Sequence, residues 1–340
     1  MPKPTSSVSP TLDDVAAAAG VSSATVSRSL NQPNMVSQAT RDRVNAAVQT
    51  LGYTPNFSAR ALAAKRTYTI GAIIPTMENA IFARGLQAFQ EQLNARGYTL
   101  LVSSNLYSPE LEAEQIKALV ARGADGLLLI GYAREPSIYD YLESRKVPVL
   151  LAWAYQDGQA VPAIGFDNYA AMAELTERVI AEGHKKIGII SGICDGNDRA
   201  MERVRAIRET MTRHGIDTDS VPLIETPYGI SNGETAFAEI WQQDAKPTAV
   251  ICVNDVLAVG AIKRAHALGL SIPYDVSITG FDDIDVAELV QPQLTTVHVP
   301  HRRMGKLAAD ALIQMVETKA PVPSICLESS LCIRGSLGGV

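Results

Sequence analysis

The chain has 340 residues, of which 46% are hydrophobic and 19% are charged. This length and composition predict a globular protein of about two or three domains. No apolar run reaches the roughly 18 residues of a membrane span, and residues 1–10 lack the apolar core of a secretory signal. We therefore expect a cytoplasmic protein.

The net charge of −6 is unevenly distributed. Residues 1–66 carry a net charge of +4, from seven Lys or Arg and three Asp, whereas the remaining residues carry −10. A small basic segment on a larger acidic part indicates that only this segment contacts a polyanion. The four cysteines form no C-x-x-C pair, so we expect free thiols, no metal site and no cofactor.

Residues 11–31, TLDDVAAAAGVSSATVSRSLN, predict two short helices joined by a tight corner. Thr11 has the side chain of a helix N-cap, and two Asp residues follow in the positive first turn. Gly20 ends the first helix, and the second begins at Ser22 or Ser23. With a third helix from Ser37 to Leu51, this is the pattern of a helix-turn-helix.

The outer face of the second helix carries short side chains and one guanidinium, which suits a helix that enters the major groove of DNA. The residues of this face are Ser23, Ala24, Thr25, Ser27 and Arg28. The alternative is a three-helix bundle that does not bind DNA.

Residues 11–62 resemble, almost position for position, the head of the lactose-repressor (LacI/GalR) family. The shared pattern continues as VSQATRDRV and LGYTPNFSARAL. The resemblance implies that Ser23, Ala24, Thr25 and Arg28 face base edges. It also implies contacts to phosphates or sugars by the remaining polar residues of the head, namely Thr11, Ser22, Ser27, Asn31, Tyr53 and Asn56.

Residues 54–66 follow the predicted head of residues 1–53 and are too short to form a stable helix alone. The resemblance implies a hinge helix that becomes ordered with its twin in the minor groove. Leu62, preceded by Ala61, would then be the apolar wedge that opens and bends the duplex. The alternative is a plain interdomain linker.

From residue 67 onward, short apolar runs alternate with amphipathic helical segments. The apolar runs are residues 69–75, 99–104, 126–130, 147–152, 163–166, 186–191, 249–253 and 277–281. Helices are expected at 79–96, 110–122, 168–182, 199–214 and 255–268. Repeated βαβ units predict an α/β body of doubly wound parallel sheets, and 270 residues suit two lobes better than one.

The body also resembles the LacI/GalR family, in AVICVNDVLAVGAIKRAHALGLSIPYDVSITGFDDID and in the stretch around residues 165–192. The resemblance implies the two-lobed fold of periplasmic sugar-binding proteins with three crossovers. Lobe one would comprise about residues 67–165 and 297–323, and lobe two about 166–296 and 324–340. The positions that match the family's effector pocket are Ile81, Phe82, Trp153, Arg203, Tyr228, Asn254, Asp255 and Asp282.

These side chains suit a sugar, because aromatic faces stack on its ring while Asn, Asp and Arg bind hydroxyls or a carboxylate. For Asn254 and Asp255, the alternative is that they only cap the next helix, and for Trp153 and Tyr228 it is core packing. Where the family has Gly-aromatic, this chain has Ala206-Ile207. Whether Arg203, Arg199 or Arg205 faces the cleft therefore stays open.

Residues 229–233, GISNG, match the G-x-S-x-G motif of a hydrolase, with Asp282 and His298 or His301 downstream in the required order. The interpretation that we favour makes Ser231 a helix N-cap, with Glu234 completing a capping box. No nucleotide-binding or zinc-protease motif accompanies it.

The sequence thus predicts a transcription regulator, a repressor and not an enzyme, that binds a pseudo-palindromic operator in double-stranded DNA as a homodimer. A small molecule in the interlobe cleft would control it; a sugar or sugar acid is favoured, and a purine is the alternative. The competing functions are a sugar-capture module and a serine hydrolase. No heptad tail follows Ser336, which favours a dimer over a tetramer.

Replacement of the wedge residue tests the hinge hypothesis. Leu62→Ala should lower affinity for the specific operator far more than affinity for random DNA, because only the operator is opened and bent by the side chain. Gel-shift titrations on both DNAs at one salt concentration would measure this. Equal losses on the two DNAs would contradict a wedge role.

Overall fold

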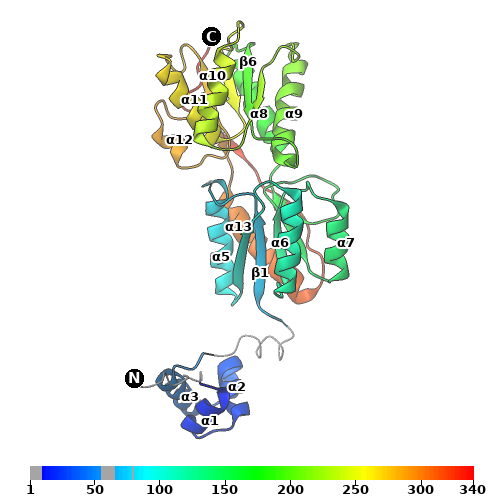
Figure 1. The fold of residues 1–340 in the computed structure, drawn as a ribbon, viewed down its shortest axis with the longest axis vertical. Coiled ribbons are helices and arrows are strands. Elements are labelled where there is room, and N and C mark those ends of the chain that lie inside the picture. Colours follow the sequence, from blue (N-terminus) through cyan, green and yellow to red (C-terminus); the bar gives the residue numbers. More distant parts are fainter. Residues whose placement is uncertain (1–9, 55–65, 79) are drawn as a thin grey trace, which may run out of the picture. The chain divides into compact units, whose positions relative to one another are not determined.

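The computed structural model describes residues 10–54, 66–78 and 80–340. The chain divides into two compact units, one ending at Thr67 and the other extending from Tyr68 to Val340 (Figure 1). We call them the head and the body. Of the helices that the structure describes, none combines the length and apolar character needed to cross a bilayer.

The head consists of α1 (Leu12–Ala19), α2 (Ser23–Asn31), a 3-10 turn (Pro33–Met35) and α3 (Gln38–Leu51). Thr11 caps α1 reciprocally with Asp14: the Thr11 hydroxyl accepts from the Asp14 amide at 3.3 Å, and the Asp14 carboxylate accepts from the Thr11 amide at 2.8 Å. Gly20 ends α1 with φ of 66°, in the left-handed region that glycine tolerates. The buried core is Val15, Ala16, Ala19, Val26, Val44, Ala47 and Tyr53.

Lobe one of the body is built on a parallel sheet of six strands in the order β11-β5-β4-β3-β1-β2. The strands are β1 (Thr69–Ile74), β2 (Thr99–Ser104), β3 (Gly126–Ile130), β4 (Val149–Ala152), β5 (Ala163–Gly165) and β11 (Ile325–Cys326). Since β11 pairs with β5, this sheet extends past the expected lobe limit near residue 323.

Helices cover both faces of this sheet, as the βαβ pattern predicts (Figure 1). They are α5 (Ala80–Ala95), α6 (Pro109–Ala121), α7 (Pro136–Ser144) and α13 (His301–Thr318). Alternate residues of β3 point to opposite faces: Leu128 joins the core under α5 and α13, whereas Leu127 and Leu129 join the core under α6 and α7.

Lobe two has a parallel sheet of four strands in the order β7-β6-β8-β9. The strands are β6 (Ile187–Ser191), β7 (Leu223–Glu225), β8 (Ala249–Cys252) and β9 (Ser277–Thr279). Its helices are α8 (Asn168–Ala181), α9 (Asp198–Arg213), α10 (Ile230–Trp241), α11 (Asp255–Ala267) and α12 (Val286–Leu289). Ser231 lies inside α10, because the helix begins one residue earlier; the expected N-cap role is wrong, and Gly229 occupies that position.

The chain passes between the lobes three times. It leaves lobe one after β5, returns through β10 (Thr296–His298), and leaves again through β12 (Ser330–Cys332). β10 and β12 pair antiparallel, so two of the three crossovers support one another. The end of the chain then bonds to lobe two, where the Ile278 amide donates to the Ser336 carbonyl at 2.9 Å.

Helices α5 and α13 pack closely through two glycines. A Cβ added to Gly305 would lie 2.0 Å from the Gly85 carbonyl oxygen, and one added to Gly85 would lie 2.5 Å from the Trp153 ring. Only glycine permits this approach. The contact fixes the start of α5, which carries Ile81 and Phe82, relative to Trp153.

Candidate functional site

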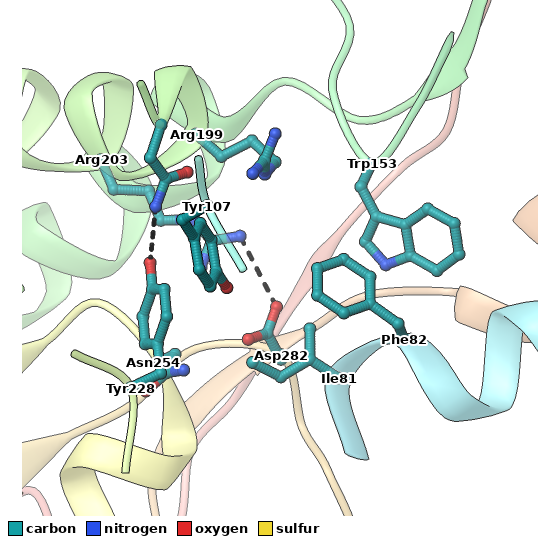
Figure 2. Close-up of a pocket in the computed structure, with 10 residues that line it drawn as sticks. Ile81, Phe82, Tyr107, Trp153, Arg199, Arg203, Tyr228, Asn254 and Asp282 are labelled. Atoms are coloured by element: carbon teal, nitrogen blue, oxygen red, sulfur yellow. Dashed lines mark hydrogen bonds and ion pairs between the residues drawn. The ribbon is translucent and has the colours of Figure 1, made fainter. Parts of the chain in front are cut away.

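A cavity lies between the two lobes (Figure 2). Its walls come from both lobes and are part aromatic and part polar. The lining residues are Ile81, Phe82, Tyr107, Trp153, Asn197, Arg199, Arg203, Tyr228, Asn254 and Asp282.

Most of these side chains follow the carboxyl end of a strand, where doubly wound sheets bind ligands. Trp153 follows β4 directly, Asn254 is two residues past β8, and Asp282 is three residues past β9. Tyr107 and Tyr228 come from the loops after β2 and β7. The two sheets thus direct their strand ends toward one cavity.

Arg203 is held in place by three groups that surround its guanidinium. Its Nε donates to the Asn168 Oδ1 at 2.9 Å, and its Nη1 donates to the Val253 carbonyl at 2.7 Å. The guanidinium carbon lies 3.7 Å from the centre of the Phe281 ring. This fixed cation then lies 3.5 Å, Nη2 to Oδ1, from Asp282 (Figure 2).

Two lining residues keep buried polar atoms that have no hydrogen-bond partner among the residues that the structure describes. They are the Nδ2 of Asn254 and both carboxylate oxygens of Asp282. Asn254 also caps α11, since its Oδ1 accepts from the Leu257 amide at 2.9 Å, and this leaves the amide nitrogen free for another acceptor. The cavity thus offers one donor and two acceptors without hydrogen bonds, one of the acceptors in an ion pair with Arg203, and these match the needs of a hydroxylated ligand.

Burial raises the pKa of Asp282 to about 6, although the positive charges of Arg203 and Arg199 act in the opposite direction. Burial also raises the pKa of Asp255 well above its usual range, and the nearby Asp282 charge adds to the rise. Hydrogen bonds from the Thr296 hydroxyl and the Ile284 amide lower the pKa of Asp255 and offset part of this rise.

The aromatic walls form two pairs. Phe82 and Trp153 meet edge to face with ring centres 5.4 Å apart, and Tyr107 and Tyr228 lie 5.5 Å apart. The Tyr228 hydroxyl accepts from the Asn197 Nδ2 at 3.2 Å. Burial raises the pKa of Tyr107 and of Tyr228, so both phenols keep their protons at neutral pH.

Behind the aromatic wall, the buried imidazole of His301 contacts both lobes. Its Nδ1 accepts from the Trp153 Nε1 at 3.2 Å, and its Nε2 donates to the Asp282 carbonyl at 3.2 Å. Burial lowers the pKa of His301 to about 4, so the ring is neutral at physiological pH.

The lobes also meet beside the cavity. Asp198, the first residue of α9, accepts from the Tyr132 amide of lobe one at 2.6 Å and from the Arg199 Nη1 at 2.9 Å. Arg199 lines both the first cavity and a second one, whose lining includes Arg205. Arg203 and Arg199 therefore face the first cavity, and Arg205 does not line it.

The structure brings seven of the eight predicted effector residues together at this cavity; Asp255 is the exception. Asp255 is fully buried and accepts from the Thr296 hydroxyl at 2.6 Å and the Ile284 amide at 2.8 Å, so it fastens the loop after β9. Sequence reasoning missed Tyr107 and Asn197. Both lie in loops that follow a strand, Tyr107 after β2 and Asn197 after β6, and this position could have identified them.

In the head, Ala24 and Arg28 are exposed on one side of α2, while Val26 on the other side is fully buried. Ser22 caps α2, and its hydroxyl oxygen lies 2.9 Å from that of Thr25. The Ser23 hydroxyl donates to the Asp13 carboxylate at 2.5 Å, which ties α2 to α1.

Of the other residues predicted to contact DNA, some form contacts within the head and some lie outside the described residues. Thr11 forms its reciprocal cap with Asp14, and Tyr53 belongs to the buried core. Ser27 is half-buried, and Asn31 ends α2. Asn56, Ala61 and Leu62 lie outside the described residues.

Both units match known proteins. Residues 11–56 match bacterial regulatory proteins of the lacI family, and residues 176–337 match the periplasmic binding protein-like domain. The chain is 31% identical over 316 residues to the HTH-type transcriptional regulator GntR of Escherichia coli K12, covering 93% of this chain and 95% of that protein. The chain belongs to the LacI family of bacterial regulatory proteins.

Further relatives place this LacI-family member among transcriptional regulators. It is 33% identical over 312 residues to the HTH-type transcriptional repressor PurR of Vibrio atlanticus, covering 91% of this chain and 92% of PurR. It is similar to the crystal structure of the lac repressor dimer bound to operator and the anti-inducer ONPF, with TM-score 0.86 and 27% identity over 97% of this chain and all of that one. The predicted fold and regulatory function are confirmed.

The raised pKa of Asp282 leads to a prediction about stability. An unfolded Asp ionises near pH 4, so its buried counterpart destabilises the folded state increasingly as the pH rises from about 4 to about 6, and fully above that. Two pKa units correspond to about 3 kcal/mol. At pH 7, Asp282→Asn should therefore have a higher urea midpoint than the wild type and a free energy of unfolding larger by about 1–3 kcal/mol. This difference in free energy should become smaller toward pH 4.5.

Asp140→Asn, at an exposed position of α7, serves as the matched control and should show no such gap. The opposite ordering, with Asp282→Asn less stable than the wild type at pH 7, would show that the Arg203 charge outweighs burial.

Proposed function

We propose that this LacI-family regulator acts in the cytoplasm as a homodimeric repressor and not as an enzyme. Two heads bind the half-sites of a pseudo-palindromic operator, hinge segments at residues 54–66 order at its centre, and Leu62 bends the DNA. A small hydroxylated molecule in the interlobe cavity, a sugar or sugar acid, changes operator affinity. The observation that carries the effector part is the set of unpartnered polar atoms in a cavity between aromatic walls.

The composition of the cavity supports this ligand class. The Asp282 carboxylate can accept from hydroxyls and Asn254 Nδ2 can donate to them, while Arg203 Nη2 lies 3.5 Å from Asp282 Oδ1. Phe82 and Trp153 supply apolar faces for a carbon skeleton.

The two functions are connected thermodynamically. A ligand that bonds to residues of both lobes favours one interlobe arrangement, and operator binding by the dimer depends on that arrangement. Coupling of this kind is typically about 1–3 kcal/mol, which changes operator affinity by roughly 5–150-fold. The residues of lobe one and lobe two that share the ligand are therefore the ones through which the effector acts.

Selection of genomic fragments by the full chain tests the DNA-binding part. The wild type should enrich one pseudo-palindrome, and Arg28→Ala should lose that enrichment, because a base-reading guanidinium contributes about 1–3 kcal/mol of discrimination. Arg145→Ala, at an exposed position of lobe one, is the control of equal charge and should select like the wild type. Enrichment that survives in Arg28→Ala would remove the base-reading role of α2.

Thermal unfolding in the presence of candidate effectors tests the cavity. We expect D-glucose, D-ribose or D-gluconate to raise the Tm and hypoxanthine, the purine alternative, to leave it unchanged. At a hundredfold excess over Kd the bound compound should stabilise the folded chain by about 2.7 kcal/mol. Asn254→Ser keeps an oxygen to cap α11 but removes the amide donor, so it should bind that compound about 5–150-fold more weakly. An unchanged Tm with every compound, or an equal shift in Asn254→Ser, would argue against this site.

A further inference from the structure

One buried side chain contacts two cavity residues from different lobes without lining the cavity itself. His301 begins α13 of lobe one, and its ring bonds to the indole of Trp153 and to the backbone of Asp282. Trp153 follows β4 of lobe one, whereas Asp282 follows β9 of lobe two. The imidazole therefore joins the aromatic wall of the cavity to the residue that supplies its carboxylate.

The two partners fix the protonation of the ring. A carbonyl oxygen can only accept, so the Nε2 that faces Asp282 carries the hydrogen. An indole N–H can only donate, so the Nδ1 that faces Trp153 must have a free lone pair. A single neutral tautomer satisfies both bonds, and no nitrogen is left over.

Both partners have a backbone conformation that side chains disfavour. Trp153 has φ of 60° and Asp282 has φ of 107°, in the region that glycine occupies readily and other residues seldom do. Such conformations cost roughly 1–3 kcal/mol each and persist only where the surroundings hold them. The bonds to His301 are part of what holds these two residues.

The surroundings leave the imidazole little freedom. Its residue is 4% exposed, and the Trp153 ring beside it lies against Gly85, where α5 and α13 approach closely. The centres of the indole and imidazole rings are 6.2 Å apart. Trp153 is held on its other side as well, because its carbonyl accepts from the Asn168 Nδ2 at 3.1 Å.

We propose that His301 is a positioning residue of the effector cavity, which holds Trp153 of lobe one and Asp282 of lobe two in a fixed relation. This inference rests on the proposed function of the cavity. It implies that the lobes cannot separate at the cavity without breaking the bond between His301 and Asp282. It also implies that effector affinity depends on a side chain that the effector does not touch.

Three substitutions separate the two bonds. His301→Asn places an amide oxygen where Nδ1 lies and keeps the bond from Trp153, but it does not reach Asp282. His301→Gln places an amide nitrogen where Nε2 lies and keeps the bond to Asp282. His301→Phe keeps the ring volume and removes both bonds. All three are made in Trp241→Phe, which leaves Trp153 as the single tryptophan of the chain.

Two fluorescence measurements on the full chain then test the role. The emission maximum of Trp153 reports the hydrogen bond of its indole. We expect the emission maximum of His301→Asn to match that of the parent Trp241→Phe chain, and the maxima of His301→Gln and His301→Phe to shift. Quenching by acrylamide, a neutral probe, reports access to the cavity. We expect His301→Asn and His301→Phe to raise the quenching constant about twofold or more, because each loses the bond from His301 to Asp282 of lobe two. His301→Gln keeps this bond between the lobes and should raise the quenching constant less.

His184→Phe is the matched control, because His184 is also a buried imidazole, bonded to Thr248 at 2.9 Å and to the Gly338 carbonyl at 2.8 Å. It should leave both signals of Trp153 unchanged even where it lowers the Tm. The proposal is overturned if His301→Phe behaves as the parent chain does, or if His184→Phe changes the quenching equally. Neither fluorescence measurement uses DNA or effector. A negative result here would therefore contradict the role of His301 and not the proposed regulatory function, and a failed operator selection would not affect this test.

Discussion

The arrangement of the cavity depends on one buried carboxylate, that of Asp282, which lies where the two lobes meet. A buried carboxylate without hydrogen bonds is costly, and neither of its oxygens has such a bond. What makes the position tolerable is a cation at 3.5 Å, Arg203, whose own place is fixed by Asn168 and by the Val253 carbonyl. The hydrogen bonds from Arg203 to Asn168 and to the Val253 carbonyl therefore orient the guanidinium, whereas the side chain of Asp282 has no such bonds.

This arrangement explains why a ligand would act on the whole body. A hydroxyl bonded to Asp282 removes an electrostatic cost that the folded protein otherwise bears, and Asn254 Nδ2 gains a partner at the same time. The free energy is available only while both lobes contribute, since Trp153 and Phe82 come from one lobe and Asp282 and Asn254 from the other. Polar groups without hydrogen bonds in the cavity would therefore favour the arrangement of the lobes in which a ligand bonds to them.

Most of the strands could be predicted from the sequence, because runs such as residues 69–74 and 126–130 are apolar throughout and buried on both faces. The resemblance to the LacI/GalR family identified Trp153, Asn254 and Asp282, and each of them follows a strand. It failed for Asp255, because adjacent side chains at the start of a helix point in different directions, and this one faces Thr296. His301 could not be predicted, since its partner Trp153 is 148 residues away in the chain.

The cavity and the crossovers are connected through the backbone of Asp282. Its amide donates to the Val297 carbonyl at 3.0 Å, within crossover strand β10, and its carbonyl accepts from His301, three residues past that strand. Asp282 is therefore bonded on both sides to the segment that returns the chain to lobe one. A ligand that pulls on its carboxylate changes the position of a peptide unit shared with this crossover. Because packed interfaces shift between discrete arrangements and do not deform continuously, a small displacement at Asp282 would act on the lobe arrangement through this shared segment.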